Sequence, residues 1–321
     1  MSKSFARWIG IGMLTSAAVI WGFAFSAQKQ LMDHMGPITC NCIRFSIGAL
    51  FLFLVILARG AFLKKKTGAR VFPRISAAEW RGGIACGLLL AAASLVQQIG
   101  LTESSAGTTA FITALYIVMV PAFGVFFGRR ARIGIWLSVI LALAGAYLLT
   151  VVGASAAADG ISSLGDLFSA IGSSKMVFRF GDILVFICAI LYSFHILTID
   201  RFVDRCDGLV LSMIQFAVVG VVTCVPMLVF ESVSLSAVFA GLGSLLYLGI
   251  MSGGVAFTLQ ILGQARVEPT VASMLMSLES VFGAIGGALV LHEVMNAAEV
   301  IGCAIVFSAI IISQLIAKEK N

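Results

Sequence analysis

The chain is organised around residues 268–293, which read EPTVASMLMSLESVFGAIGGALVLHE. Pro269 suits the start of a helix, because the first backbone N–H groups of a helix have no partner within it. The apolar run that follows is long enough to cross a bilayer at about 1.5 Å per residue. Near its middle lies Glu279, and a carboxylate at that depth costs a few kcal/mol. We therefore expect Glu279 to face the interior of a helix bundle, either with a functional role or as a structural partner of a neighbouring helix.

Composition is that of a membrane protein. Hydrophobic residues make up 60% of the 321 residues, charged residues make up 11%, and the mean hydropathy is +1.08. No soluble domain needs so much apolar surface. The net charge of +6 does not indicate a nucleic-acid partner, because the basic residues gather in loops between apolar segments. The seven cysteines form no CxxC pair, so we expect no disulfide framework, no metal site and no cofactor.

Hydropathy predicts an all-α polytopic membrane protein with ten transmembrane helices. The first span is too long for the core of a signal peptide, so we expect it to be retained. Residues 153–180 are rich in Gly, Ser and Ala, which suits a short interfacial helix or a disordered linker. The ten predicted spans are 8–30, 38–58, 81–101, 107–128, 133–152, 181–200, 209–230, 241–263, 270–291 and 297–317.

The distribution of basic residues predicts the orientation. If both termini are cytoplasmic, the loops after the second, fourth, sixth and eighth spans are cytoplasmic too. These loops and the two tails hold all but four of the 21 Lys and Arg residues. The other four are Lys29 and Arg44, in or near spans, and Lys175 and Arg179 on the opposite side. Because cytoplasmic loops carry an excess of basic residues, we expect a multi-pass protein of the inner (plasma) membrane with both termini in the cytoplasm.

The two halves of the chain resemble one another. Positions in the first two spans recur about 171 residues later, and positions in the third and fourth spans recur about 163 residues later. The paired positions are Trp21 and Tyr192, Asn41 and Ser212, Arg44 and Gln215, Gln97 and Gln260, and Tyr116 and Glu279.

These pairs predict two five-helix repeats, residues 1–152 and 181–321, joined by an extracytoplasmic linker at 153–180. Because each repeat crosses the membrane an odd number of times, the second repeat enters from the opposite face, so the repeats are inverted. Inverted repeats have two near-equivalent packings that open to opposite sides, which is what alternating-access transport requires.

Short motifs occur in order along nearly the whole chain. They are Trp21-Gly22, Arg44-Phe45, Gly100-Leu101, Ser104-Ser105-Ala106, the helix that holds Glu279, His292-Glu293 and Gly302. In this set and order the chain resembles the EamA-type transporters of the drug/metabolite transporter superfamily. The resemblance implies ten helices, cytoplasmic termini and a central cavity lined mainly by the third, fourth, eighth and ninth helices. The chain departs from the family pattern at Ser280, where proline is usual, at His292, where glycine is usual, and in its longer 153–180 loop.

Arg44 is a candidate for contact with a substrate. A guanidinium inside a membrane is always charged and needs a carboxylate, backbone carbonyl groups or water. It can hold the carboxylate or phosphate of a substrate, or it can snorkel or tie helices together. Its repeat partner, Gln215, is neutral, so both roles stay open.

Six further residues, which form three repeat pairs, are candidates for the same cavity. Gln97 and Gln260 are each followed three residues later by Gly, so two backbones can approach beside an amide that donates and accepts hydrogen bonds. Such amides line a cavity or join helices. Tyr116 mirrors Glu279 and is expected to be its partner or a wall against the substrate. Trp21 and Tyr192 mirror each other and serve either substrate contact or packing.

Glu279 and His195 are the candidates for proton coupling. Burial in a low-dielectric span disfavours the charged form of a carboxylate, which suits a group that binds and releases protons. His195 can relay protons, or it can be a hydrogen-bonded histidine of the core. With Asp200 it matches the acyltransferase pattern H-x-x-x-x-D, but the two lie about 140° apart on a helix, and companion motifs are missing. We therefore assign no catalytic residue and expect no enzyme.

The function expected is that of a secondary transporter that moves small organic metabolites or drugs outward, with proton coupling as a hypothesis. The sequence holds no GxxxxGK[ST] motif, so it contains no nucleotide-driven pump. Two other classes remain open. One is a flippase for lipids or lipid-linked sugars, and the other is a membrane-embedded transferase, which would need acid–base groups near one interface. The expected partners are a small-molecule substrate and the lipid bilayer, and the chain is expected to be a monomer or a homodimer.

Overall fold

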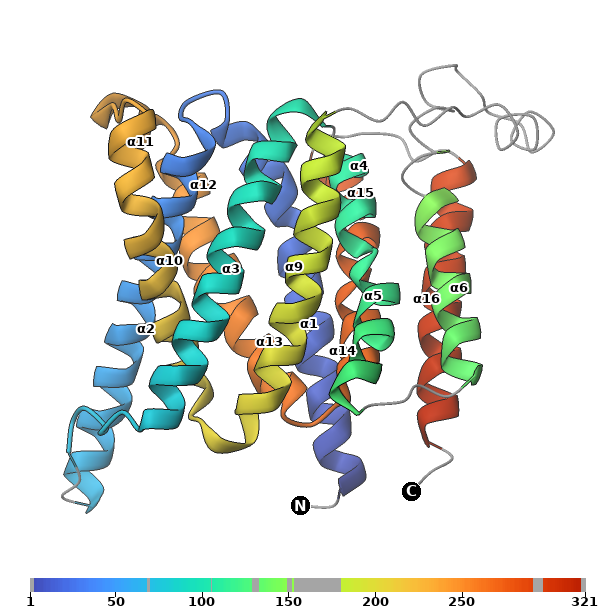
Figure 1. Cartoon of the computed structure of the whole chain (residues 1–321), viewed down its shortest axis with the longest axis horizontal. Helices are drawn as coiled ribbons and strands as arrows, with labels where there is room; N and C mark the ends of the chain where they lie inside the picture. The colour runs from blue at the N-terminus through green and yellow to red at the C-terminus, as the bar shows by residue number, and fades with distance from the viewer. Residues whose placement is uncertain are drawn as a thin grey trace.

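The computed structural model describes residues 3–67, 70–104, 106–128, 133–148, 152, 180–290 and 297–318. All regular elements within these ranges are helices, and α1 begins at the same end of the bundle at which α16 ends (Figure 1). The predicted linker helix before residue 180, the basic loop at 129–132 and the His292-Glu293 motif lie outside the described residues.

The first half of the chain forms five apolar helices within the described residues, of which the fourth is in two parts. They are α1 (Lys3–Leu31), α2 (Pro37–Thr67), α3 (Ala77–Glu103), α4 (Ala106–Ala114) with α5 (Tyr116–Gly124) and the 3₁₀ turn η1 (Val125–Phe127), and α6 (Ile133–Tyr147).

The second half has the same order of helices, but here the third helix is also divided and contains a π-helical stretch. The elements are α9 (Phe180–Phe202) with the 3₁₀ turn η3 (Val203–Arg205), α10 (Gly208–Phe230), α11 (Leu235–Ala240), α12 (Leu242–Leu246), the π-helix η4 (Tyr247–Phe257), α13 (Thr258–Gln264), α14 (Pro269–Met276), α15 (Leu278–Val290) and α16 (Ala297–Lys318).

Six helices among the described residues are long and apolar enough to cross a bilayer, and four shorter apolar helices accompany them. Each overlaps one of the ten predicted spans. The six long helices are Ser4–Leu31, Pro37–Lys66, Ala77–Glu103, Phe180–Arg205, Gly208–Phe230 and Leu242–Gln264, and the shorter ones are Thr109–Gly124, Ile133–Tyr147, Pro269–Ile285 and Ala297–Ser313. The prediction of an all-α membrane protein with about ten helices is confirmed.

Helix packing follows a two-fold pattern that exchanges the halves. α1 packs against α14 and α15, and its equivalent α9 packs against α4 and α5. α3 packs against α9 and α10, while the equivalent pair η4 and α13 packs against α1, and η4 also packs against α2. The pairs α2–α10 and α6–α16 each join two equivalent helices. Inverted repeats related by a pseudo-two-fold axis produce such a pattern.

Both ends of the α2–α10 pair are tied by a carboxylate. At one end Arg59 Nη2 lies 2.5 Å from Asp207 Oδ2, and Asp207 Oδ1 also accepts a hydrogen bond from the backbone of Leu209, which caps α10. At the other end the Glu231 carboxylate accepts hydrogen bonds from the backbone N–H groups of Ile38 (3.0 Å) and Thr39 (2.7 Å) at the start of α2. These groups have no partner within their own helix, so Glu231 joins the two helices where α2 begins.

The fourth helix of each half is interrupted close to the middle of the bundle. The break falls at Leu115 between α4 and α5, and at Ser277 between α14 and α15. Continuous helices were predicted over 107–128 and 270–291, so the breaks are a correction to that prediction. Around the second break, serine side chains donate hydrogen bonds to backbone carbonyl groups. Ser277 Oγ donates to Met274 O at 2.8 Å, and Ser280 Oγ donates to Ser277 O at 2.9 Å.

A close approach of α1 and α15 brings one helix of the first half against the interrupted helix of the second. A Cβ atom at Gly22 would lie 2.7 Å from backbone atoms of Phe282 and Gly283, so only glycine fits at this crossing. The Trp21-Gly22 motif therefore sets the distance between α1 and α15, and the Trp21 side chain lies next to that crossing.

Candidate functional site

A cavity with an empty volume of about 560 Å³ is lined by side chains of both halves. Helices α1, α2 and α9 contribute to its wall in addition to the third, fourth, eighth and ninth spans that the family resemblance implies. The seven residues predicted to contact a substrate all line this cavity: Trp21, Arg44, Gln97, Tyr116, Tyr192, Gln260 and Glu279.

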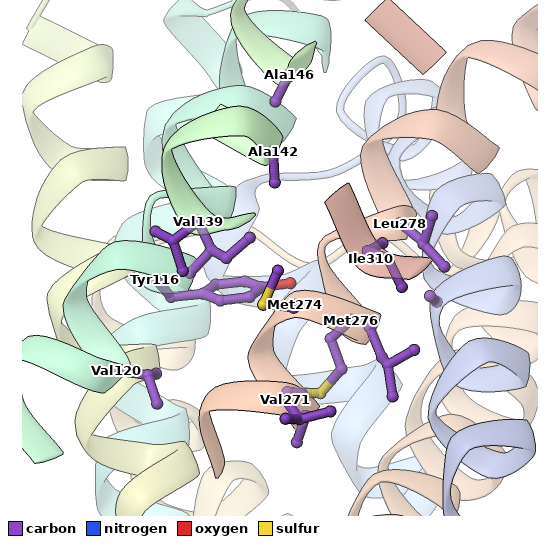
Figure 2. Packing of buried hydrophobic residues seen from close by; sticks show 14 of the residues in the cluster. Tyr116, Val120, Val139, Ala142, Ala146, Val271, Met274, Met276, Leu278 and Ile310 are labelled. Carbon is purple, nitrogen blue, oxygen red and sulfur yellow. The ribbon is translucent and has the colours of Figure 1, made fainter. Parts of the chain in front are cut away.

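Glu279 and Tyr116 join the two halves inside the cavity. Tyr116 Oη donates a hydrogen bond to Glu279 Oε1 at 3.0 Å, and both side chains are buried. Each residue lies beside the break in its own helix. Tyr116 belongs to a cluster of buried apolar side chains that includes Val139 of α6 and Met274 of α14 (Figure 2). The repeat partners are thus hydrogen-bonded to each other across the pseudo-two-fold relation.

The two glutamines of the repeat pair have different surroundings. Gln97 Nε2 donates to Thr113 Oγ1 at 3.1 Å, and Tyr192 Oη donates to Gln97 Oε1 at 3.4 Å. The Oε1 atom of Gln260 is buried and accepts no hydrogen bond within the described part of the chain. A buried polar atom without a partner costs roughly 1–3 kcal/mol. Gln260 therefore lines the cavity and keeps an amide oxygen that no donor among the described residues reaches.

Arg44 is held by an amide of its own helix. Nε and Nη2 donate to Asn41 Oδ1 at 3.1 and 2.8 Å, and the guanidinium carbon lies 4.8 Å from the centre of the Phe45 ring. Asn41 in turn donates through Nδ2 to Ser94 Oγ on α3 at 2.9 Å. Arg44 is only 5% exposed, yet it lines the cavity, so a buried cation forms part of the wall.

The wall near Trp21 is aromatic. Its ring packs edge-on against Phe257 with the ring centres 4.9 Å apart, and Phe257 also faces Phe45 at 6.2 Å. The indole Nε1 donates to Ser252 O at 3.2 Å. Since that N–H group is already used, Trp21 presents carbon surface to the cavity.

His195 is buried and lies behind the cavity wall. Its Nε2 atom is 3.0 Å from Gln215 Oε1, and its ring packs against Tyr192 and Phe257, with centres 6.4 and 6.2 Å away. Both of these rings line the cavity, whereas His195 does not. The structure thus shows a hydrogen-bonded buried histidine, and a role for His195 in proton coupling stays a prediction. Asp200, four residues after Ile196 on the same helix, does not line the cavity either.

Several lining residues were not predicted. Thr113 lies three residues before Tyr116 on the same helical face, a spacing that points to it. Phe257 and Ser252 lie on the π-helix η4, whose geometry cannot be read from hydropathy. Met276, three residues before Glu279, also lines the cavity. Among the described residues, no group of three or more His, Cys, Asp or Glu side chains could hold a metal ion.

A helical membrane bundle with duplicated halves and a cavity lined by both halves defines a class, the transporters built from inverted repeats. The comparison with protein families agrees. The chain matches the EamA-like transporter family over residues 8–151 and again over residues 179–315. It therefore belongs to that family and is a multi-pass membrane transporter, not an enzyme. The predicted family resemblance is confirmed, and the second match shows that the chain is duplicated.

Two individual proteins are also similar. An uncharacterised transporter of Archaeoglobus fulgidus is 24% identical over 307 residues, which cover 94% of this chain and 84% of the archaeal protein. A protein with a solved crystal structure has a TM-score of 0.75 and 20% identity, with 99% of each chain covered. At that identity the second likeness shows the fold alone.

Proposed function

We propose that this protein is a secondary active transporter that exports small organic metabolites or drugs by alternating access across the inner (plasma) membrane. Family membership and a cavity lined by both halves support transport, and the resemblance to drug/metabolite transporters supports export. The excess of basic residues in the predicted cytoplasmic loops supports cytoplasmic termini.

One observation carries the proposal, which is the hydrogen bond between Tyr116 and Glu279 in the cavity. A carboxyl group that is buried in the protein interior and faces a cavity can bind a proton when the cavity opens to one side and release it on the other. If substrate and proton compete for this carboxyl group, each leaves when the other binds, and the proton gradient drives export. Tyr116 does not titrate near pH 7, so the coupling is carried by the second half alone.

The moving parts are the two repeats, residues 1–152 and 181–321, with 153–180 as the extracytoplasmic linker between them. The α2–α10 pair is tied at both ends, by Arg59–Asp207 and by Glu231, which supports this pair as a fixed axis. Interrupted helices beside the site, at Leu115 and Ser277, supply the places where each repeat can bend.

The test uses purified full-length protein in lipid vesicles. Uptake and efflux of a panel of labelled organic acids, amines, amino acids and sugars are measured with and without a proton gradient. We expect movement of at least one class that depends on the gradient and slows in Gln260→Ala, which removes a polar side chain that lines the cavity. Movement of fluorescent lipids between leaflets, with no movement of any panel compound, would contradict this function and favour a flippase.

A further inference from the structure

We infer that the cavity binds an organic anion, whose oxyanion group pairs with Arg44 and whose apolar body lies against Trp21, and that Asn41 keeps the Arg44 charge available. This inference rests on the proposed transport function and specifies its substrate class.

The first step is the charge of Arg44. Within the described residues no carboxylate lies within 4.0 Å of its nitrogen atoms, since the pair Arg59–Asp207 is the one found there. Its two hydrogen bonds both go to the neutral oxygen Asn41 Oδ1. An amide oxygen orients a guanidinium without neutralising it, so the positive charge at the wall remains uncompensated by those residues.

The second step is the position of Asn41. This residue is fully buried, and its Nδ2 group donates to Ser94 Oγ on α3, which donates onward to Ala91 O at 3.4 Å. Because the amide nitrogen is committed to Ser94, the amide oxygen must face Arg44. The network uses Nε and one N–H of Nη2, and among the described residues Nη1 donates to none. The free N–H groups suit a carboxylate or phosphate bound in a bidentate manner.

The third step is a comparison with the other half. Gln215 occupies the position of Arg44 in the second repeat, is fully buried, and is hydrogen-bonded to His195 away from the cavity wall. The equivalent position is therefore neutral and engaged within the protein. Only the first repeat presents a cation here, which gives the cavity a defined positive end.

The fourth step is the surface beside that cation. Phe45 lies under the guanidinium, and Trp21 and Phe257 continue the aromatic wall. The indole N–H of Trp21 is bonded to Ser252 O, so the ring offers carbon atoms to an occupant. An oxyanion with an apolar or aromatic body matches a cation next to such a wall.

The test compares three probes that differ in one group, 3-phenylpropanoate, phenethylamine and 3-phenylpropan-1-ol. Their binding to the purified full-length protein is measured by isothermal titration. We expect the acid to bind at least ten times more tightly than the alcohol and the amine. Equal binding of all three probes, binding of none, or preference for the amine would overturn the inference.

Asn41→Asp places a carboxylate on the guanidinium with almost no change of shape. It should remove the preference for the acid, with at least a tenfold loss of acid affinity and little change for the alcohol. Gln215→Glu makes the same amide-to-carboxylate change at the counterpart of Arg44 in the second repeat, away from the cavity wall, and should keep the preference. If Asn41→Asp does not fold, Arg44→Gln, which introduces the residue of the other repeat, should abolish the preference in the same way.

An unchanged preference in a folded Asn41→Asp or Arg44→Gln protein would refute the role of these residues. Proton-driven export is read separately in vesicles. If the protein exports a neutral or cationic compound when a proton gradient is applied, yet binds no anion, the anion inference is wrong. The proposed transport function is then still supported.

Discussion

The hydrogen bond between Tyr116 and Glu279 predicts a measurable energetic coupling between the two halves. The oxygen atoms lie 3.0 Å apart, and the side chains are 4% and 5% exposed. Tyr116→Phe removes the donor and keeps the ring in its cluster with Val139 and Met274. Loss of a buried hydrogen bond to an acidic group costs about 1.5–3 kcal/mol, so the free energy of unfolding should fall by about 2 kcal/mol.

The assay is unfolding by sodium dodecyl sulfate in mixed micelles, followed by circular dichroism. Tyr192→Phe is the matched control, because Tyr192 lines the same cavity but donates to Gln97 over 3.4 Å, near the limit for a hydrogen bond. Its loss should cost less than about 1 kcal/mol. In a Glu279→Leu background, Tyr116→Phe should cost almost nothing, since its partner is gone. Equal losses with and without Glu279 would refute the coupling.

Three further predictions concern the stability of the helix bundle, the access of solvent to the cavity and the orientation of the chain in the membrane. Arg59→Ala should lower the unfolding free energy by less than about 1 kcal/mol, because that ion pair is solvent-exposed, whereas Asp207→Ala should cost more, since it also removes the cap of α10. In a protein whose native cysteines have been replaced, the Gln97→Cys variant should react with a small water-soluble thiol reagent, because Gln97 lines the cavity. The Gln98→Cys variant should not react, because Gln98 is buried and does not line the cavity. A reporter fused to the C-terminus should be cytoplasmic and one inserted within 153–180 external, and the reverse pattern would refute the orientation.

Hydropathy and internal repetition were sufficient to predict the helical membrane fold. Ten apolar segments require ten helices, because no other open structure satisfies backbone hydrogen bonds within a bilayer. The repeat pairing also located the cavity wall. Gln97 with Gln260 and Tyr116 with Glu279 are polar residues at equivalent positions, and equivalent positions meet where inverted repeats face one another. Their placement could therefore be predicted, while their roles in binding remain proposals.

Other features could not be predicted, because they depend on packing between distant segments. Phe257 forms part of the wall, yet its counterpart at the offset of about 163 is Ser94, so the repeat gives no signal for it. The breaks at Leu115 and Ser277 were missed since apolar runs look the same whether a helix is continuous or not. The orientation of the Asn41 amide, which accepts hydrogen bonds from Arg44, depends on a hydrogen bond to Ser94. Ser94 lies on another helix, so only the folded chain brings it close to Asn41.

The most direct test of the proposed mechanism measures substrate accumulation and exchange in vesicles that contain the Glu279→Gln variant. The amide has nearly the same shape but cannot bind and release a proton. The compound is the one that the panel identifies, and Glu79→Gln is the control, because Gln can replace Glu in the Ser76–Glu79 capping box of α3.

Wild-type protein and Glu79→Gln should both accumulate the compound when a proton gradient is applied. Glu279→Gln should fold and exchange labelled for unlabelled compound, yet it should not accumulate the compound against its own gradient. Accumulation by Glu279→Gln at the wild-type rate would contradict the account and leave Glu279 as a structural partner of Tyr116.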